Sequence, residues 1–189
     1  MTYPAPDFLT RRRLILAALP AFYAVPALAD VGPALLTGSV ARMKIEPAPK
    51  PAPEFAFTDA EDKPLTLAAY KGKAVLLNFW ATWCAPCVKE MPSLDKLQAE
   101  MNTDKFLVLP LSLDGPTRSK VKPFYDDRKL AHLGIYFDKA RKSLQAFDVG
   151  ILPTSILIDG QGRIVGRLEG EAEWDTPEAL ALMKAAAGG

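Results

Sequence analysis

The stretch Asn78–Pro92 reads NFWATWCAPCVKEMP and contains both cysteines of the chain, Cys84 and Cys87. It follows a near-continuous apolar run, Ala74–Phe79, which is typical of a buried central strand. After the cysteines, apolar residues recur at helical spacing as far as Met101. The sequence therefore predicts a buried strand, a short turn that carries both cysteines, and a helix.

The position of the two cysteines predicts their reactivity. Cys84 would stand at the start of a helix, where free N–H groups and the helix dipole favour a thiolate and lower the thiol pKa. The two intervening residues, Ala85 and Pro86, let one turn bring both sulfurs within bonding distance. We expect Cys84 to attack a partner disulfide and Cys87 to resolve the mixed disulfide.

Physical arguments disfavour other uses of the cysteine pair. A disulfide that encloses two residues cross-links almost no chain, so it has little value as a structural bridge. A zinc site needs about four ligands, and the chain adds only one histidine, His132, which we expect on the surface. No metal is predicted, although Cu(I) bound by two thiolates stays open as an alternative.

The N-terminal residues 1–29 have the features of an export signal. Three arginines, Arg11–Arg13, precede the apolar stretch Leu14–Val25, and Ala27–Ala29 supplies a small-residue cleavage site. The arginine run also fits a twin-arginine signal. A spanning helix needs ~20 apolar residues, so cleavage is favoured, with an uncleaved signal-anchor as the alternative. Either form would place the chain in an oxidising compartment.

The remaining sequence predicts a tether followed by one domain. Residues 30–53 form the tether, because proline occupies every second position from Pro47 to Pro53 and such a segment is extended and semi-rigid. A short helix is expected within Val31–Met43. The folded domain is expected over residues 54–189. The net charge of the chain is +1, which gives no reason to expect a nucleic-acid partner.

Within this domain the pattern alternates between strands and helices. Pro110 suggests that its strand lies at an edge or near an end. The predicted elements are a β-hairpin over Phe55–Leu67, a strand over Phe106–Leu113, a helix over Ser119–Asp127, a short strand at Ile135–Phe137, a helix over Ala140–Phe147, a hairpin of Thr154–Ile158 with Arg163–Leu168, and a last helix capped by Asp175–Glu178. This order predicts an α/β fold with a mixed central sheet flanked by helices.

The segment Phe79–Cys87 resembles the active site of the thioredoxin superfamily. It is most similar to the exported TlpA/ResA/CcmG branch of bacterial thiol-disulfide oxidoreductases, and to TlpA-type members in particular. The resemblance extends over about Phe55–Ala187. It implies a thioredoxin fold with an N-terminal β-hairpin and a central αβ insertion, and no cofactor.

The resemblance also implies a client-binding surface. Gly150–Thr154 matches the family loop before a cis-proline, Pro153, which faces the cysteines. Backbone of the preceding residue, Leu152, would then be free to pair with a client strand. Trp83 and Pro86, which flank Cys84, are expected on the same surface.

Glu90 is similar to the active-site glutamate of this branch. It lies one helical turn beyond Cys87, where a half-buried carboxylate could carry the proton of the resolving thiol. A solvated helix glutamate is the alternative. Asn78 stands where cytoplasmic thioredoxin has a buried aspartate, and an amide cannot transfer a proton. That difference shifts the acid–base role to Glu90 or to water.

As a function, the resemblance implies a periplasmic reductant of specific protein disulfides, either free or anchored to the membrane only by its N-terminus. A membrane thiol carrier of the DsbD or CcdA kind would supply electrons. The clients would belong to copper and cytochrome oxidase assembly or to cytochrome c maturation. One alternative is a thiol peroxidase, but it needs threonine or serine where Ala81 stands. The other is a Sco-like Cu(I) metallochaperone, whose cysteines have three residues between them.

Overall fold

The computed structural model describes residue 1, residues 31–101 and residues 103–188. The predicted export signal therefore lies almost entirely outside the described residues. Within them, no helix is both long enough and apolar enough to cross a membrane. The elements in chain order are η1 (Pro33–Leu35), η2 (Gly38–Val40), β1 (Lys44–Pro51), β2 (Phe57–Asp59), β3 (Pro64–Leu65), η3 (Leu67–Tyr70), β4 (Ala74–Trp80), α1 (Ala85–Glu100), β5 (Phe106–Ser112), η4 (Gly115–Lys120), α2 (Val121–Arg128), β6 (Tyr136–Phe137), α3 (Lys142–Ala146), β7 (Thr154–Ile158), β8 (Arg163–Glu169) and α4 (Pro177–Ala186).

The strands form one mixed sheet in the order β1-β8-β7-β4-β5-β6-β2-β3. Strand β4 is parallel to β5 and antiparallel to β7, so it has a neighbour along both sides. All seven of its residues are buried, as the apolar run predicts. The predicted α/β class and central strand are therefore confirmed.

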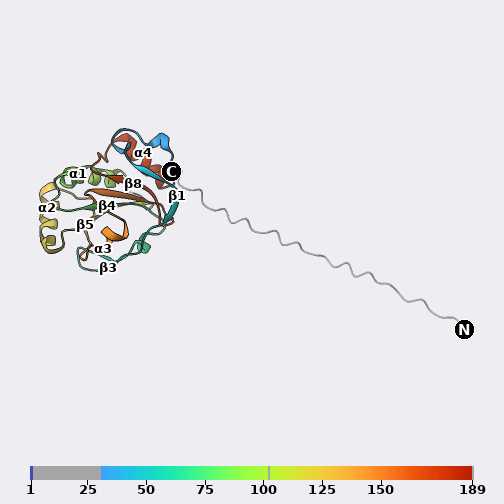
Figure 1. Cartoon of the computed structure of the whole chain (residues 1–189), viewed down its shortest axis with the longest axis horizontal. Coiled ribbons are helices and arrows are strands. Elements are labelled where there is room, and N and C mark those ends of the chain that lie inside the picture. The colour runs from blue at the N-terminus through green and yellow to red at the C-terminus, as the bar shows by residue number, and fades with distance from the viewer. Residues whose placement is uncertain (2–30, 102, 189) are drawn as a thin grey trace.

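Helices cover both faces of this sheet. In Figure 1, α1 and α4 lie above the central strands and α3 lies below them. Side chains of β4 alternate accordingly: Leu76 and Trp80 belong to the core beneath α1 and α4, while Leu77 and Phe79 belong to the core on the side of α3. The C-terminal end of β4, and the cysteines that follow it, therefore lie where the central strands end, between the two packed cores.

The segment before Glu54 differs from the predicted tether. Strand β1 pairs antiparallel with β8 at the edge of the sheet. Val40 and Met43 are buried in the same core as α4, and two short 3-10 helices replace the single helix expected there. The alternating prolines tolerate this pairing because an edge strand is paired along one side only and the register of β1 is irregular between Ile45 and Lys50.

Pro110 also differs from its prediction, since β5 has a strand on each side. However, β6 is so short that it pairs only with Leu111 and Ser112. At Val108 the backbone N–H instead donates to the side chain of Gln98 on α1, at 2.7 Å. Pro110 therefore lies on a stretch of β5 that β6 does not reach, which is why the missing N–H is tolerated.

Candidate active site

The two cysteines lie at the junction that the sequence predicts. Cys84 is the N-cap of α1, and its sulfur accepts a hydrogen bond from the backbone N–H of Cys87 at 3.3 Å. The two residues form a disulfide. Cys87 is fully buried, whereas Cys84 retains 7% of its surface. A partner can therefore reach Cys84 first, because only Cys84 of the two keeps exposed surface and borders a surface groove.

A buried carboxylate holds the turn that precedes Cys84. Asp114, which follows β5, accepts a hydrogen bond from the backbone N–H of Thr82 at 3.0 Å and one from the Thr82 hydroxyl. The hydroxyl of Ser112 donates to the same carboxylate at 2.8 Å. These contacts connect the loop after β4 to the end of β5 and orient the residues that enter α1.

An apolar groove of about 440 Å³ opens beside Cys84. Apart from Met1, the exposed large apolar side chains of the described residues are Trp83 (61%) and Ile151 (53%), and both line this groove. Exposed apolar side chains that cluster in one place indicate a binding surface. The lining residues are Trp83, Cys84, Pro86, Leu113, Arg141, Leu144, Val149, Gly150, Ile151 and Leu152.

Three of the residues expected on the client surface, Trp83, Pro86 and Leu152, come together in this groove. Pro153 directly follows Leu152, and the bond between them is the cis peptide bond that the sequence predicts. Pro153 is buried rather than exposed in the groove. The structure thus places Trp83 and Pro86 on one wall and the loop ending at Leu152 on another.

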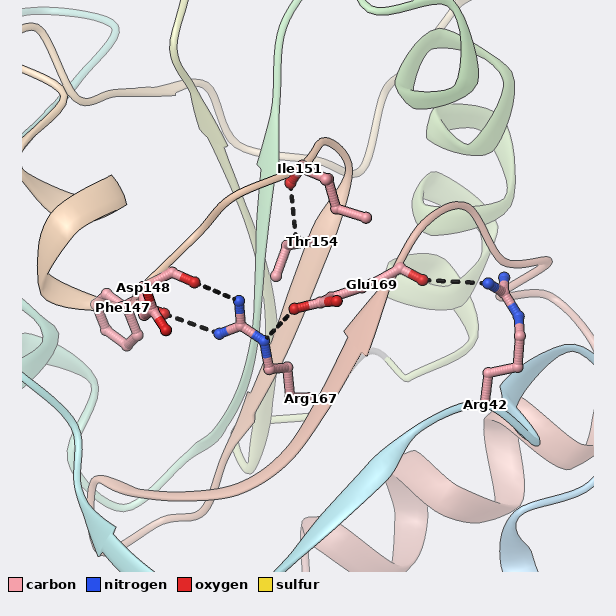
Figure 2. Close-up of polar contacts among 7 residues, drawn as sticks. All are labelled: Arg42, Phe147, Asp148, Ile151, Thr154, Arg167 and Glu169. Atoms are coloured by element: carbon pink, nitrogen blue, oxygen red, sulfur yellow. Dashed lines mark hydrogen bonds and ion pairs between the residues drawn. The ribbon is translucent and has the colours of Figure 1, made fainter.

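Arg167 holds the loop that leads into this second wall (Figure 2). From β8, its guanidinium donates to the carbonyl oxygens of Phe147 at 2.8 Å and Asp148 at 2.7 Å. Nearer to Pro153, the hydroxyl of Thr154 donates to the carbonyl oxygen of Ile151 at 2.9 Å. These bonds fix the backbone that presents Ile151 to the groove.

Glu90 points into the protein rather than into solvent. It is only 3% exposed, and its carboxylate accepts three hydrogen bonds. Asn78 Nδ2 donates to Oε1 at 2.7 Å, while the backbone N–H of Ala172 and the indole N–H of Trp174 donate to Oε2 at 3.1 Å and 3.2 Å. The solvated glutamate weighed as an alternative is therefore not what the structure shows.

Burial raises the pKa of Glu90 to about 7, because the ionised form is poorly solvated there. The hydrogen bonds from Asn78, Ala172 and Trp174 oppose this rise, and the nearby charge of Glu171 adds to it. Near neutral pH both protonation states are thus populated. A group with this property can accept and release a proton at physiological pH.

Asn78 is suited to both protonation states of Glu90. Its amide nitrogen donates to Glu90 and also to the hydroxyl of Ser155 at 3.0 Å, while its Oδ1 has no partner among the described residues. Rotation of the amide would turn Oδ1 toward a protonated Glu90, which could then donate to it. An aspartate at this position would instead place a second acidic group beside Glu90.

Sequence reasoning did not identify the partners of Glu90 or the role of Asp114. Ala172 and Trp174 are more than 80 residues away from Glu90, so only the folded chain brings them together. In the sequence, only the tryptophan within the polar segment Glu171–Asp175 indicated that this segment contacts the core. His132 is exposed, as predicted, and residues 31–101 and 103–188 contain no cluster of acidic, histidine or cysteine residues able to hold a metal ion.

Comparisons with known proteins agree with this site. The AhpC/TSA family model matches residues 48–167. The thiol-disulfide oxidoreductase ResA of Bacillus anthracis is 41% identical over 122 residues, which cover 65% of this chain and 69% of the relative. ResA of Bacillus subtilis (strain 168) is 33% identical over 114 residues, covering 60% and 63%.

A solved structure of another protein has a similar fold. The crystal structure described as a thiol:disulfide interchange protein DsbE from Chlorobium tepidum is 28% identical, with a TM-score of 0.67. The match covers 77% of this chain and all of that chain. Together with the cysteine pair at the start of α1, these matches show that the chain belongs to the AhpC/TSA family and, within it, to the ResA-like thiol-disulfide oxidoreductases with a thioredoxin fold.

Proposed function

We propose that this oxidoreductase acts outside the cytoplasm as a reductant of protein disulfides, with Cys84 as nucleophile and Cys87 as resolving thiol. One observation carries the proposal: the more accessible cysteine borders an apolar groove, while its partner is buried one helical turn from a buried carboxylate. A protein client can dock in such a groove, and its disulfide then meets Cys84 before Cys87.

The reaction transfers two electrons to the client. The Cys84 thiolate attacks one sulfur of the client disulfide, which breaks that bond, forms a mixed disulfide and releases the first client thiolate. Cys87 then loses its proton and attacks Cys84 Sγ. This second step forms the Cys84–Cys87 disulfide and releases the second client thiolate. A thiol donor must afterwards return two electrons and two protons to the pair.

Glu90 is proposed as the group that receives the proton of Cys87. Cys87 is fully buried, so bulk water reaches its thiol poorly, and the buried carboxylate of Glu90 lies one turn further along the same helix. A pKa of about 7 lets it take up that proton and release it again without a large free-energy difference.

The reducing direction follows from the same carboxylate. DsbA is a strong oxidant because its reduced, thiolate form is stabilised. An ionised carboxylate near the dithiol has the opposite effect, since it disfavours a neighbouring thiolate. Glu90 should therefore stabilise the disulfide relative to the dithiol and lower the reduction potential.

The location and the pathway are proposed from the sequence and its family resemblance. Residues 1–29 would export the chain to the periplasm, by cleavage or as an anchor to the inner membrane. A membrane thiol carrier of the DsbD or CcdA kind would be the donor. Clients in copper and cytochrome oxidase assembly, or in cytochrome c maturation, fit the TlpA-like character of the sequence.

The reduction potential of the full chain tests this direction. The protein would be equilibrated with glutathione or dithiothreitol buffers and the ratio of dithiol to disulfide measured by alkylation. We expect a value near or below the ~−270 mV of thioredoxin. A value near the ~−120 mV of DsbA would assign the opposite direction, that of an oxidant.

The alternative functions are separated by two further measurements. A thiol peroxidase would consume hydrogen peroxide, and we expect no such activity because Ala81 supplies no hydroxyl three residues before Cys84. A Cu(I) chaperone would retain copper against a competing chelator when reduced. Retention of one equivalent would favour that function over disulfide reduction.

A further inference from the structure

The loop between β8 and α4 supplies two of the three hydrogen bonds that Glu90 accepts. Ala172 provides its backbone N–H and Trp174 its indole N–H, both to Glu90 Oε2. The loop itself, residues 170–176, contains no helix or strand. Core packing fixes part of their position, because Trp174 is fully buried and Ala172 is buried beside it. The loop backbone depends for the rest on contacts from other segments.

The loop is held by the segment that precedes β1. Arg42 donates to the carbonyl oxygen of Glu169 at 3.2 Å and to that of Glu171 at 2.7 Å. The hydroxyl of Ser39 donates to the carbonyl oxygen of Glu173. The carbonyl groups of residues 169, 171 and 173 thus point to this segment, while the donors of residues 172 and 174 point to Glu90. The carbonyl groups and the Ala172 N–H alternate in direction as they do in an extended chain, whereas the Trp174 donor belongs to its side chain.

Arg42 itself starts from a well-anchored backbone. It lies between Val40 and β1, and both Val40 and the adjacent Met43 are buried in the core. Met43 packs against β8 at Gly166, where an added Cβ would lie 2.9 Å from the methionine sulfur. Strand β8 leaves room for this segment by having no side chain at that position. The guanidinium therefore extends from a fixed point to the loop.

Figure 2 shows Glu169 between two arginines that come from different parts of the chain. Arg42 holds its carbonyl oxygen from one side, and Arg167 holds its carboxylate from the other at 2.9 Å. Arg167 also holds the loop that leads to the apolar groove. The start of the Glu90 loop is in this way joined to the wall of the groove.

Other charged groups surround the polar cleft of about 700 Å³ that borders Glu90. Lys89 of α1 pairs with Glu171 at 2.6 Å, and Lys96 of the same helix pairs with Asp175 at 2.8 Å. The side chains of these lysines are 73% and 66% exposed, so each ion pair contributes little. Arg42 is exposed as well, but it differs from the lysines in donating two hydrogen bonds to backbone carbonyl oxygens of the loop. The residues with charges that line the cleft are Arg42, Lys89, Glu90, Lys96, Glu171, Glu173 and Asp175.

We propose that Arg42 is a positioning residue for the active site: by clamping the Glu169 and Glu171 carbonyls it holds Ala172 and Trp174 in place as hydrogen-bond donors to Glu90. The inference rests on the proposed role of Glu90 as proton acceptor. It assigns a function in the site to a segment whose sequence reads as a tether.

The test measures Glu90 directly, so that it does not depend on the reducing activity. The full chain would be labelled with ¹³C at glutamate side-chain carboxyls, and Glu90, assigned by its loss in Glu90→Gln, would be titrated by NMR in the oxidised protein. Arg42→Ala should raise the pKa of Glu90 by roughly half a unit to one unit, because hydrogen bonds to the ionised form favour it. Lys44→Ala removes a nearby exposed charge that makes no ion pair within the described part of the chain, and it should leave the pKa unchanged.

Trp174→Phe calibrates the effect by removing one donor directly. It should raise the pKa in the same direction, and the double variant with Arg42→Ala should shift it by less than the sum of the two, because both changes act through the same donor. Ser39→Ala is a milder second variant, with a smaller upward shift expected, in case Arg42→Ala does not fold.

Three other results would each overturn either the clamp or the proposed proton relay. A Glu90 pKa that stays at the wild-type value in Arg42→Ala and Ser39→Ala, whatever the loss in melting temperature, would make the clamp purely structural. Strict additivity with Trp174→Phe would mean that Arg42 does not act through Trp174, which contradicts the proposal as stated. If the pKa moves as expected but Glu90→Gln keeps full reducing activity, the clamp stands and the proposed relay fails.

Discussion

The two sides of the start of α1 differ in polarity and in shape. On the side of Cys84 lies the apolar groove, formed by Trp83 and the loop ending at Leu152. On the side of Glu90 lies a polar cleft of about 700 Å³, and none of the described residues lines both. A client that fills the groove would thus leave the cleft open to solvent. Under the proposed function, electrons would leave the protein on one side and protons on the other.

The largest expected effects come from the cysteines. Cys84→Ser should abolish disulfide reduction, because the remaining thiol, Cys87, is too deeply buried to form the mixed disulfide. Cys87→Ser should instead accumulate that mixed disulfide, since the resolving thiol is missing. Non-reducing gels and mass spectrometry after mixing with a model client would distinguish the two. If Cys87→Ser turns over and Cys84→Ser traps the client, the roles assigned to the cysteines are reversed.

Glu90→Gln tests whether Glu90 accepts the proton of Cys87. We expect a loss of about 10²-fold in the rate at which the mixed disulfide is resolved, within the range for general acid–base catalysis. In the wild type this rate should rise as pH passes through about 7, because only the ionised carboxylate can accept the proton. The rise should vanish in Glu90→Gln. Glu173→Gln, an exposed neighbour in the same loop, is the matched control, and an equal loss there would contradict the assignment.

The same carboxylate should make the stability of the oxidised protein depend on pH. Its pKa is raised from 4.5 in the reference state to about 7 in the fold, so the folded state binds the extra proton between these values. The free energy of unfolding should therefore fall as pH rises from 4.5 to 7, by about 3 kcal/mol relative to Glu90→Gln. Urea unfolding of both proteins across this range measures the difference. A difference that stays constant with pH would mean that Glu90 is not shifted.

The smallest expected effect concerns the groove. Ile151→Ser removes an apolar side chain that is half exposed in the free protein, so a client would lose part of its apolar contact. We expect kcat/KM for a protein client to fall by roughly 10-fold, in line with partial loss of one buried aliphatic side chain. The rate with glutathione disulfide, which is polar and has no apolar side chain to place against Ile151, should not change. Equal losses with both substrates would show damage to the cysteines rather than to docking.

Much of this protein is determined by local sequence. The apolar run before the cysteines, the helical spacing after them and the turn residues near Gly160 each specify an element within one continuous stretch, and the structure confirms those elements. The pairing of Cys84 with Cys87 is equally local, because two residues between them allow only a single turn. Pattern and propensity act over short distances, so sequence alone was sufficient for these features.

The tertiary structure decided what surrounds the cysteines. Whether Glu90 is solvated or buried depends on Trp174 and Ala172, which a strand and a loop far along the chain bring back to α1. The proline-rich segment looks like a tether because its composition favours extended chain, yet an extended chain is also what an edge strand requires. The segment becomes an edge strand rather than a tether because β8 has a free edge to pair with and the core has a position that Met43 fills.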